Sequence, residues 1–72
     1  MGKIIDARGF SCPQPVMMTV DAIKATDNGE IIVLVDNEAA RENVIRAAAS
    51  LGWLATDIQS ENDEYRITMA KR

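Results

Sequence analysis

The chain has 72 residues and a formal net charge of −3; 47% of its residues are hydrophobic, with one each of Trp, Tyr and Phe. This length is near the lower limit for one hydrophobic core, which predicts a single domain over residues 1–72. The acidic balance argues against nucleic-acid binding, which needs a field of lysine and arginine side chains. With one cysteine and no histidine, neither an intramolecular disulfide nor a usual zinc site can form, so we expect no metal and no cofactor.

The sequence also predicts where the protein is found. Residues 1–10 (MGKIIDARGF) lack the apolar core of a signal peptide. No apolar run approaches the ~20 residues that a membrane span needs. We therefore expect a cytoplasmic protein, in a compartment that keeps an unpaired thiol reduced.

The first third of the chain predicts a strand followed by a helix. Residues 3–7 (KIIDA) form a short strand candidate that ends at the turn-prone pair Arg8-Gly9. A helix is predicted over residues 16–26, with Asn28-Gly29 ending it. Its apolar side is expected from residues at helical spacing: Val16, Val20 and Ile23.

A buried strand and a second helix come next. Residues 30–36 (EIIVLVD) contain five consecutive aliphatic residues between charges, which predicts a strand buried on both faces. The second helix is expected to begin at a cap provided by Asn37 or Asp36 and to end at Gly52. Its apolar stripe is expected from five residues: Ala40, Val44, Ala47, Ala48 and Leu51.

The last twenty residues predict a β-hairpin. The runs WLATDIQS and EYRITMA alternate in polarity and are joined through residues 61–63. The element order βαβαββ predicts an α/β fold: a two-layer sandwich in which two helices pack on one face of a mixed four-stranded sheet. Half of the side chains of strand 30–36 would then need another cover, such as a second copy of the chain or an accessory domain.

The only cysteine, Cys12, lies in the stretch DARGFSCPQPVMM. Pro13 pushes the residue before it out of helical backbone geometry, and proline is favoured at the first helical position, so we expect Cys12 to cap the first helix. Unpaired amides and the positive end of the helix dipole lower the pKa of a thiol in that position and favour the thiolate. Gly9 would allow the sharp bend between the strand and the cysteine.

The neighbours of Cys12 leave alternatives open. Asp6 either adds negative charge beside the thiolate or ties down the loop backbone. Met18 is either an exposed contact beside the sulfur or a methionine at a helix edge. Arg8 is a candidate for a partner surface, although exposed arginines are commonly only solvated charge.

The composition limits the chemistry open to Cys12. No histidine is available for a Cys/His dyad, and no second cysteine can resolve a disulfide or sulfenic acid. A nucleophile that receives an atom from one protein and gives it to another remains, and a persulfide on Cys12 meets that description. The alternative is a non-catalytic interaction or regulatory module with a structural Cys12, because free cysteine commonly behaves as a small buried hydrophobe.

The stretch DARGFSCPQPVMMTVDAI resembles the TusA-like (TusA/SirA/YedF) sulfur-carrier family, which shows an aspartate, a glycine and then Cys-Pro-x-Pro at the first helix. The resemblance runs over nearly the whole chain. It implies the βαβαββ fold and a sulfurtransferase-type carrier rather than an independent enzyme. Carried over by position, Cys12 is the persulfide site, Pro13 and Pro15 shape its loop, and Asp6 and Gly9 complete the motif.

The resemblance also implies partners. The sulfur donor would be a cysteine desulfurase or a rhodanese-like protein, and the sulfur would pass to a downstream acceptor protein, with tRNA thiolation among the routes. The second half, VLVDNEAARENVIRAAASLGW, is closer to the YedF-type branch, which is associated with selenium metabolism. Members of that branch often carry a second domain, so we expect either a stand-alone homologue or a piece of a longer polypeptide.

Overall fold

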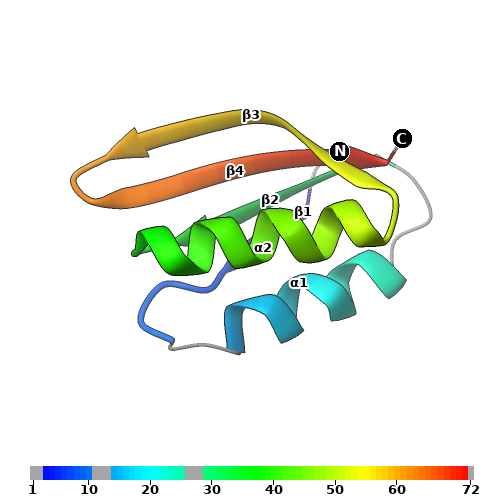
Figure 1. Cartoon of the computed structure of the whole chain (residues 1–72), viewed down its shortest axis with the longest axis horizontal. Coiled ribbons are helices and arrows are strands. Elements are labelled where there is room, and N and C mark those ends of the chain that lie inside the picture. Colours follow the sequence, from blue (N-terminus) through cyan, green and yellow to red (C-terminus); the bar gives the residue numbers. More distant parts are fainter. Residues whose placement is uncertain (1–2, 11–13, 26–28, 72) are drawn as a thin grey trace.

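Four strands form one sheet, and two helices lie side by side against the same face of it (Figure 1). The computed structural model describes residues 3–10, 14–25 and 29–71. The elements are β1 (Lys3–Asp6), α1 (Gln14–Ala25), β2 (Glu30–Val35), α2 (Glu38–Ser50), β3 (Trp53–Glu61) and β4 (Glu64–Lys71). The predicted two-layer α/β sandwich with the order βαβαββ is confirmed. Within the described ranges, neither helix has the length and apolar character to cross a membrane.

The strand order is β1-β2-β4-β3, and three connections lie at the same end of the sheet. They are the β1–α1 loop, the β2–α2 connection and the β3–β4 turn. β2 pairs in parallel with β1, so both strands end at the same edge. β4 runs antiparallel to β2 and pairs Tyr65 with Val35, so the β3–β4 turn lies at that edge too. In Figure 1 the turn, the start of α2 and the blue segment that follows β1 accordingly all lie at the left.

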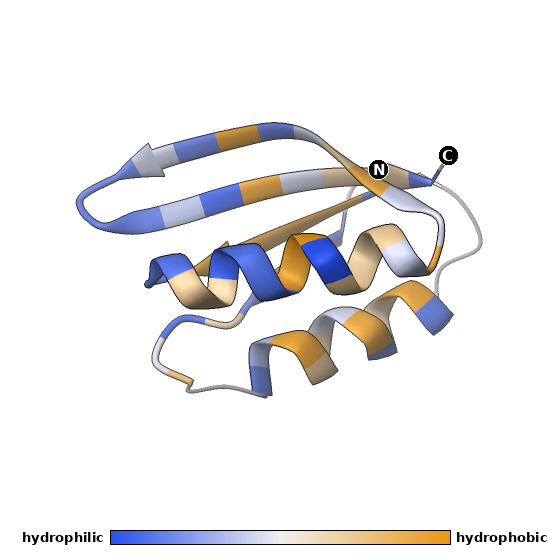
Figure 2. Ribbon diagram, in the orientation of Figure 1, coloured by the Kyte–Doolittle hydropathy of each residue, from blue (hydrophilic) through white to orange (hydrophobic). Residues whose placement is uncertain are grey.

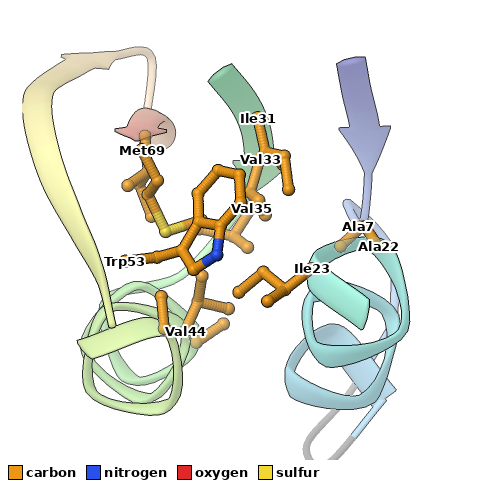
Figure 3. Close-up of a cluster of buried hydrophobic side chains, with 12 residues drawn as sticks. Ala7, Ala22, Ile23, Ile31, Val33, Val35, Val44, Trp53 and Met69 are labelled. Atoms are coloured by element: carbon orange, nitrogen blue, oxygen red, sulfur yellow. The ribbon is translucent and has the colours of Figure 1, made fainter. Parts of the chain in front are cut away.

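The core lies between the sheet and the two helices. Alternate residues of β2 and β4 point into it and are fully buried: Ile31, Val33, Val35, Ile67 and Met69. The indole of Trp53 lies beside Met69, with Val44 of α2 and Ile23 of α1 facing the same cluster (Figure 3). Burying one such side chain contributes about 1.5–3 kcal/mol, so this layer is the main source of stability in a chain without disulfides.

The face of the sheet opposite the helices is only partly covered. Ile32 and Leu34 of β2 point to it and are half-buried, so the prediction that this strand is buried on both faces was wrong for one face. Ile4 pairs with Ile32 and is 62% exposed, and Leu54 is 45% exposed. We call this surface the open face and define it by its apolar residues: Ile4, Ile32, Leu34, Leu54 and Ala70.

The buried side of α1 differs from the predicted one. The helix buries four residues, of which only Ile23 was expected: Pro15, Thr19, Ala22 and Ile23. Val16 and Val20 lie at the border of the contact and are half-buried. The Thr19 hydroxyl donates to the Pro15 carbonyl at 2.9 Å, which allows a polar side chain to be buried there. A pattern built from aliphatic residues alone therefore missed the centre of the contact.

The second helix begins and ends as expected, but one residue of its predicted apolar stripe is exposed. Asn37 is the N-cap, and its Oδ1 accepts a hydrogen bond from the backbone N–H of Ala40 at 2.7 Å. Gly52 follows the helix with a φ of +86°, which suits glycine. Leu51 was expected in the buried stripe but is exposed, because it lies at the C-cap where the chain leaves the helix.

The predicted hairpin is confirmed. Its turn is Asn62-Asp63, and both residues have positive φ values, +52° and +63°, as a type I′ turn requires. Hydrophobic and hydrophilic residues alternate along both strands (Figure 2), and Tyr65, Ile67 and Met69 share the helix-facing side. Glu61 belongs to β3 rather than to the turn.

Candidate functional site in the β1–α1 loop

The candidate site is the loop that joins β1 to α1. Cys12 and Pro13 lie outside the described residues, so the cap position expected for Cys12 and the role expected for Pro13 stay predictions. The structure describes both segments that flank them: residues 7–10 on one side, and Gln14 with Pro15 on the other. The first segment ends two residues before Cys12, and the second contains the last two residues of the Cys-Pro-x-Pro motif.

Asp6, at the end of β1, is held by Arg8. Its Oδ1 accepts from the Arg8 Nε at 2.9 Å and from the Arg8 backbone N–H at 3.1 Å, while Oδ2 accepts from Nη2 at 2.9 Å. These bonds, first from the side chain and then from the backbone, lower the pKa of Asp6 to about 2. They also raise the pKa of Arg8. Of the two alternatives for Asp6, the geometry supports the loop-binding one, since Arg8 compensates the carboxylate charge.

Arg8 also reaches across the sheet edge to the hairpin. Its Nη1 donates to Oε1 of Glu64, the first residue of β4, at 3.1 Å. The two residues are 56 positions apart in the chain. An exposed ion pair of this kind adds little to the free energy of unfolding. Its structural effect is to connect the loop to the β3–β4 turn.

Gly9 connects the loop to the end of β2. Its backbone N–H donates to Oδ2 of Asp36 at 2.8 Å, and Oδ1 of Asp36 accepts from the side-chain amide of Asn37 at 3.2 Å. Gly9 has a φ of +84°, which residues with a side chain rarely adopt. A Cβ there would meet no atom within 4 Å, so the backbone conformation and not lack of space explains the glycine.

The loop leads into a firmly packed helix start. α1 begins at Gln14, two residues before the stretch 16–26 predicted as helix, and Pro15 is fully buried. The first turn of α1 contains no acidic residue. The helix therefore supplies no carboxylate of its own that would neutralise the positive end of its dipole.

Two exposed apolar side chains flank the motif. Phe10, two residues before Cys12, is 47% exposed, and Met17 on α1 is 53% exposed. Met18 is half-buried and packs against the core. The exposed methionine is thus Met17, which the sequence pattern did not single out because the buried side of α1 was placed incorrectly.

Two residues that contact the loop were not predicted from the sequence. Asp36 could have been found from its position directly after a buried strand, at the sheet edge where sites tend to form. Glu64 had no such signal, because its contact with Arg8 depends on the strand order. The roles predicted for Arg8 and Met18 at a partner surface stay predictions.

Comparison with known proteins places the chain in a family. The family model "Sulfurtransferase TusA" matches residues 3–71. The chain is similar to two archaeal proteins, both named "putative sulfur carrier protein": one from Archaeoglobus fulgidus (29% identity, covering 94% of each chain) and one from Methanocaldococcus jannaschii (31% identity, covering 96% of this chain and 93% of that one).

A solved structure shows the same fold. The crystal structure of a SirA-like protein from Desulfitobacterium hafniense superimposes with a TM-score of 0.86 at 30% identity, covering 97% of this chain and 96% of that one. The family resemblance inferred from the sequence is confirmed, while the YedF-type branch stays a prediction. The chain belongs to the TusA sulfurtransferase family.

Proposed function

We propose that this protein is a sulfur carrier that holds a persulfide sulfur on Cys12. The observation that carries the proposal is the β1–α1 loop, which is hydrogen-bonded to two other parts of the fold, the start of β4 and the residue after β2, and leads into a helix start free of acidic side chains. Such a helix start favours a thiolate over a thiol. Membership in the TusA family and the names of the two similar archaeal proteins support the same role.

The proposed reaction exchanges one sulfur–sulfur bond for another. The Cys12 thiolate attacks the outer sulfur of a persulfide on the donor protein. A bond forms between Cys12 Sγ and that sulfur, while the bond between the outer sulfur and the donor cysteine breaks. The donor leaves as a thiolate and Cys12 becomes the persulfide, so no external oxidant or reductant is needed.

The role requires a protein partner on each side of the transfer. The donor is a cysteine desulfurase or a rhodanese-like protein, and the acceptor is a protein of sulfur or selenium metabolism, with tRNA thiolation as one destination. Phe10 and Met17 offer exposed apolar contacts beside the motif. We place this exchange in the cytoplasm, with no resident metal or cofactor.

Mass spectrometry tests the proposal directly. After incubation with a cysteine desulfurase and cysteine, the wild-type chain is expected to gain one sulfur atom that a reducing agent removes. Cys12→Ala should gain none, and Cys12→Ser is the control that keeps the size of the side chain. A wild-type chain that stays unmodified would exclude the carrier role with this donor class, and a rhodanese-like donor is the second arm of the same experiment.

The pH dependence of alkylation tests the ionised thiol. Iodoacetamide reacts with the thiolate, so the alkylation rate of Cys12 should reach half its maximum well below the value of about 8.5 for a free cysteine. An alkylation profile like that of free cysteine would show that the helix start does not activate the thiol.

The open face supports a second candidate, an interaction or regulatory module in which Cys12 is structural. Ile4 and Leu54 are 62% and 45% exposed on this surface, which suits a partner that covers it. The two roles are separated by the molar mass in solution and by thiol reactivity. An unreactive thiol in a stable dimer that Ile4→Ser dissociates would favour the second role; a reactive thiol in a monomer would favour the carrier.

A further inference from the structure

We propose that Asp36 and Glu64 are positioning residues for sulfur transfer, which fix the backbone that leads into Cys12. This inference deepens the proposed carrier function and rests on it. Both carboxylates lie outside the Cys-Pro-x-Pro segment, one directly after β2 and one at the start of β4.

Asp36 anchors the loop at Gly9, three residues before Cys12 in the chain. The hydrogen bond from the Gly9 N–H to Oδ2 is short, 2.8 Å, and a carboxylate acceptor makes a stronger bond to an N–H group than a neutral acceptor does. The other oxygen of Asp36 accepts from Asn37, whose own Oδ1 caps α2. The orientation of the carboxylate is therefore set by a helix that is not part of the loop.

Glu64 anchors the loop through Arg8. The bonds between Arg8 and Asp6 span only two residues, so they shape the loop locally without attaching it to a distant element. The bond to Glu64 spans 56 residues and ends on the hairpin. It is the contact through which the position of the loop relative to β4 is held.

Holding this loop matters because transfer between two sulfur atoms has strict geometric demands. The attacking sulfur must lie about 3–3.5 Å from its target and in line with the bond that breaks, and a displacement of ~1 Å can cost about 100-fold in rate. Gly9 has more conformational freedom than any other residue type, so its conformation depends on the bond to Asp36. Loss of that bond should increase the range of positions open to Cys12.

Single-turnover loading of Cys12 by a persulfide-carrying desulfurase, with the carrier in excess and its concentration varied, tests the inference. Asp36→Ala is expected to lower the maximal loading rate about tenfold, and Glu64→Gln about threefold, with the half-saturating carrier concentration unchanged. Asp36→Asn keeps an oxygen that can accept from Gly9, so its rate should return to within about threefold of wild type.

Each variant has a matched control. Glu61→Gln removes the same charge from the position of β3 directly opposite Glu64, and Asp21→Ala removes an exposed carboxylate from α1. Both should load at the wild-type rate. All rates are measured at a temperature at which circular dichroism shows each variant to be folded, so a lower melting temperature alone cannot produce the effect.

The possible results separate the inference from the proposed function. If the wild type gains no sulfur, the carrier function fails and the positioning role fails with it. If the wild type loads and both Asp36→Ala and Glu64→Gln load at its rate, only the positioning role is wrong. A change confined to the half-saturating concentration would assign the two carboxylates to docking and would also overturn the inference.

Discussion

Ile67 and Ile58 lie directly opposite each other on β4 and β3, yet Ile67 is fully buried and Ile58 is 42% exposed. Both point to the helix side of the sheet. β4 is an inner strand and β3 is an edge strand, so the helices cover the first side chain and leave part of the second in water. The pair therefore separates the contribution of burial to the free energy of unfolding from the contribution of strand pairing.

Truncation of these two isoleucines should have very different effects. We expect Ile67→Ala to lower the free energy of unfolding by about 2–5 kcal/mol, because it leaves a cavity in the core. Ile58→Ala should cost less than about 1 kcal/mol, since much of its side chain already contacts water. Urea unfolding followed by circular dichroism measures both. Equal losses would mean that Ile58 is covered in solution, for example by a partner.

The N-cap of α2 should contribute measurably to stability. Asn37→Ala removes the oxygen that accepts from the Ala40 N–H at 2.7 Å. The expected loss is about 1 kcal/mol, and Asn37→Ser should recover most of it because serine is an equally good cap. The same urea titration provides the measurement. An alanine variant as stable as the serine variant would show that the cap bond is replaced by water.

The hairpin turn offers a stabilising substitution. Asp63 has a φ of +63°, a conformation that glycine adopts without steric cost and that Asn-Gly turns use most often. Asp63→Gly should raise the free energy of unfolding by about 0.5 kcal/mol, because the relief of strain slightly exceeds the entropy that glycine loses on folding. Asp63→Val is the control for an effect of opposite sign: a β-branched side chain is disfavoured at positive φ, so this variant should be less stable than wild type.

The pair formed by Asp6 and Arg8 predicts a pH dependence of stability. Because the pKa of Asp6 falls from 3.8 to about 2 in the folded state, its contribution is complete above about 3.8 and is lost as the pH falls towards 2. Wild type should therefore melt at a higher temperature than Asp6→Asn at neutral pH, and the difference should disappear near pH 2. Asp21→Asn, on the exposed side of α1, is the control. A difference that stays constant over this range would contradict the assignment.

The sequence predicted the elements well where one local signal decides the structure. A cap at Asn37 or Asp36 marked the start of α2, where the structure has Asn37, and residues 61–63 marked the hairpin. The alternating polarity of the run EYRITMA matches the structure, in which Tyr65 and Ile67 lie on one face of the sheet. These features depend on neighbours in the chain, so periodicity and turn chemistry contain enough information to predict them.

The errors have two sources: a local side-chain bond that a hydrophobicity pattern ignores, and the arrangement of elements distant in the chain. Thr19 is buried because its hydroxyl finds a carbonyl in its own helix, which hydrophobicity alone does not reveal. Ile32 is only half-buried because, among the described residues, no helix or strand covers the open face.

The candidate site likewise combines residues that a local motif predicts with contacts that it does not predict. Asp6 and Gly9 were predicted from the motif, but the bond from Arg8 to Glu64 joins residues 56 positions apart. The bond from Gly9 to Asp36 spans 27 positions. The first bond follows from a strand order in which β4 lies next to β2, and the second from the parallel pairing of β1 with β2; no local pattern in the sequence determines these pairings.

The position of Trp53 has a practical consequence for work on this protein. The residue is the single indole of the chain, is 2% exposed, and lies at the start of β3, at the edge of the sheet away from Gly9 and Asp36. Its fluorescence should therefore shift to longer wavelength when the core opens, and should stay constant while Cys12 gains or loses a sulfur. The molecule thus carries an intrinsic optical probe that follows unfolding separately from chemistry at the thiol.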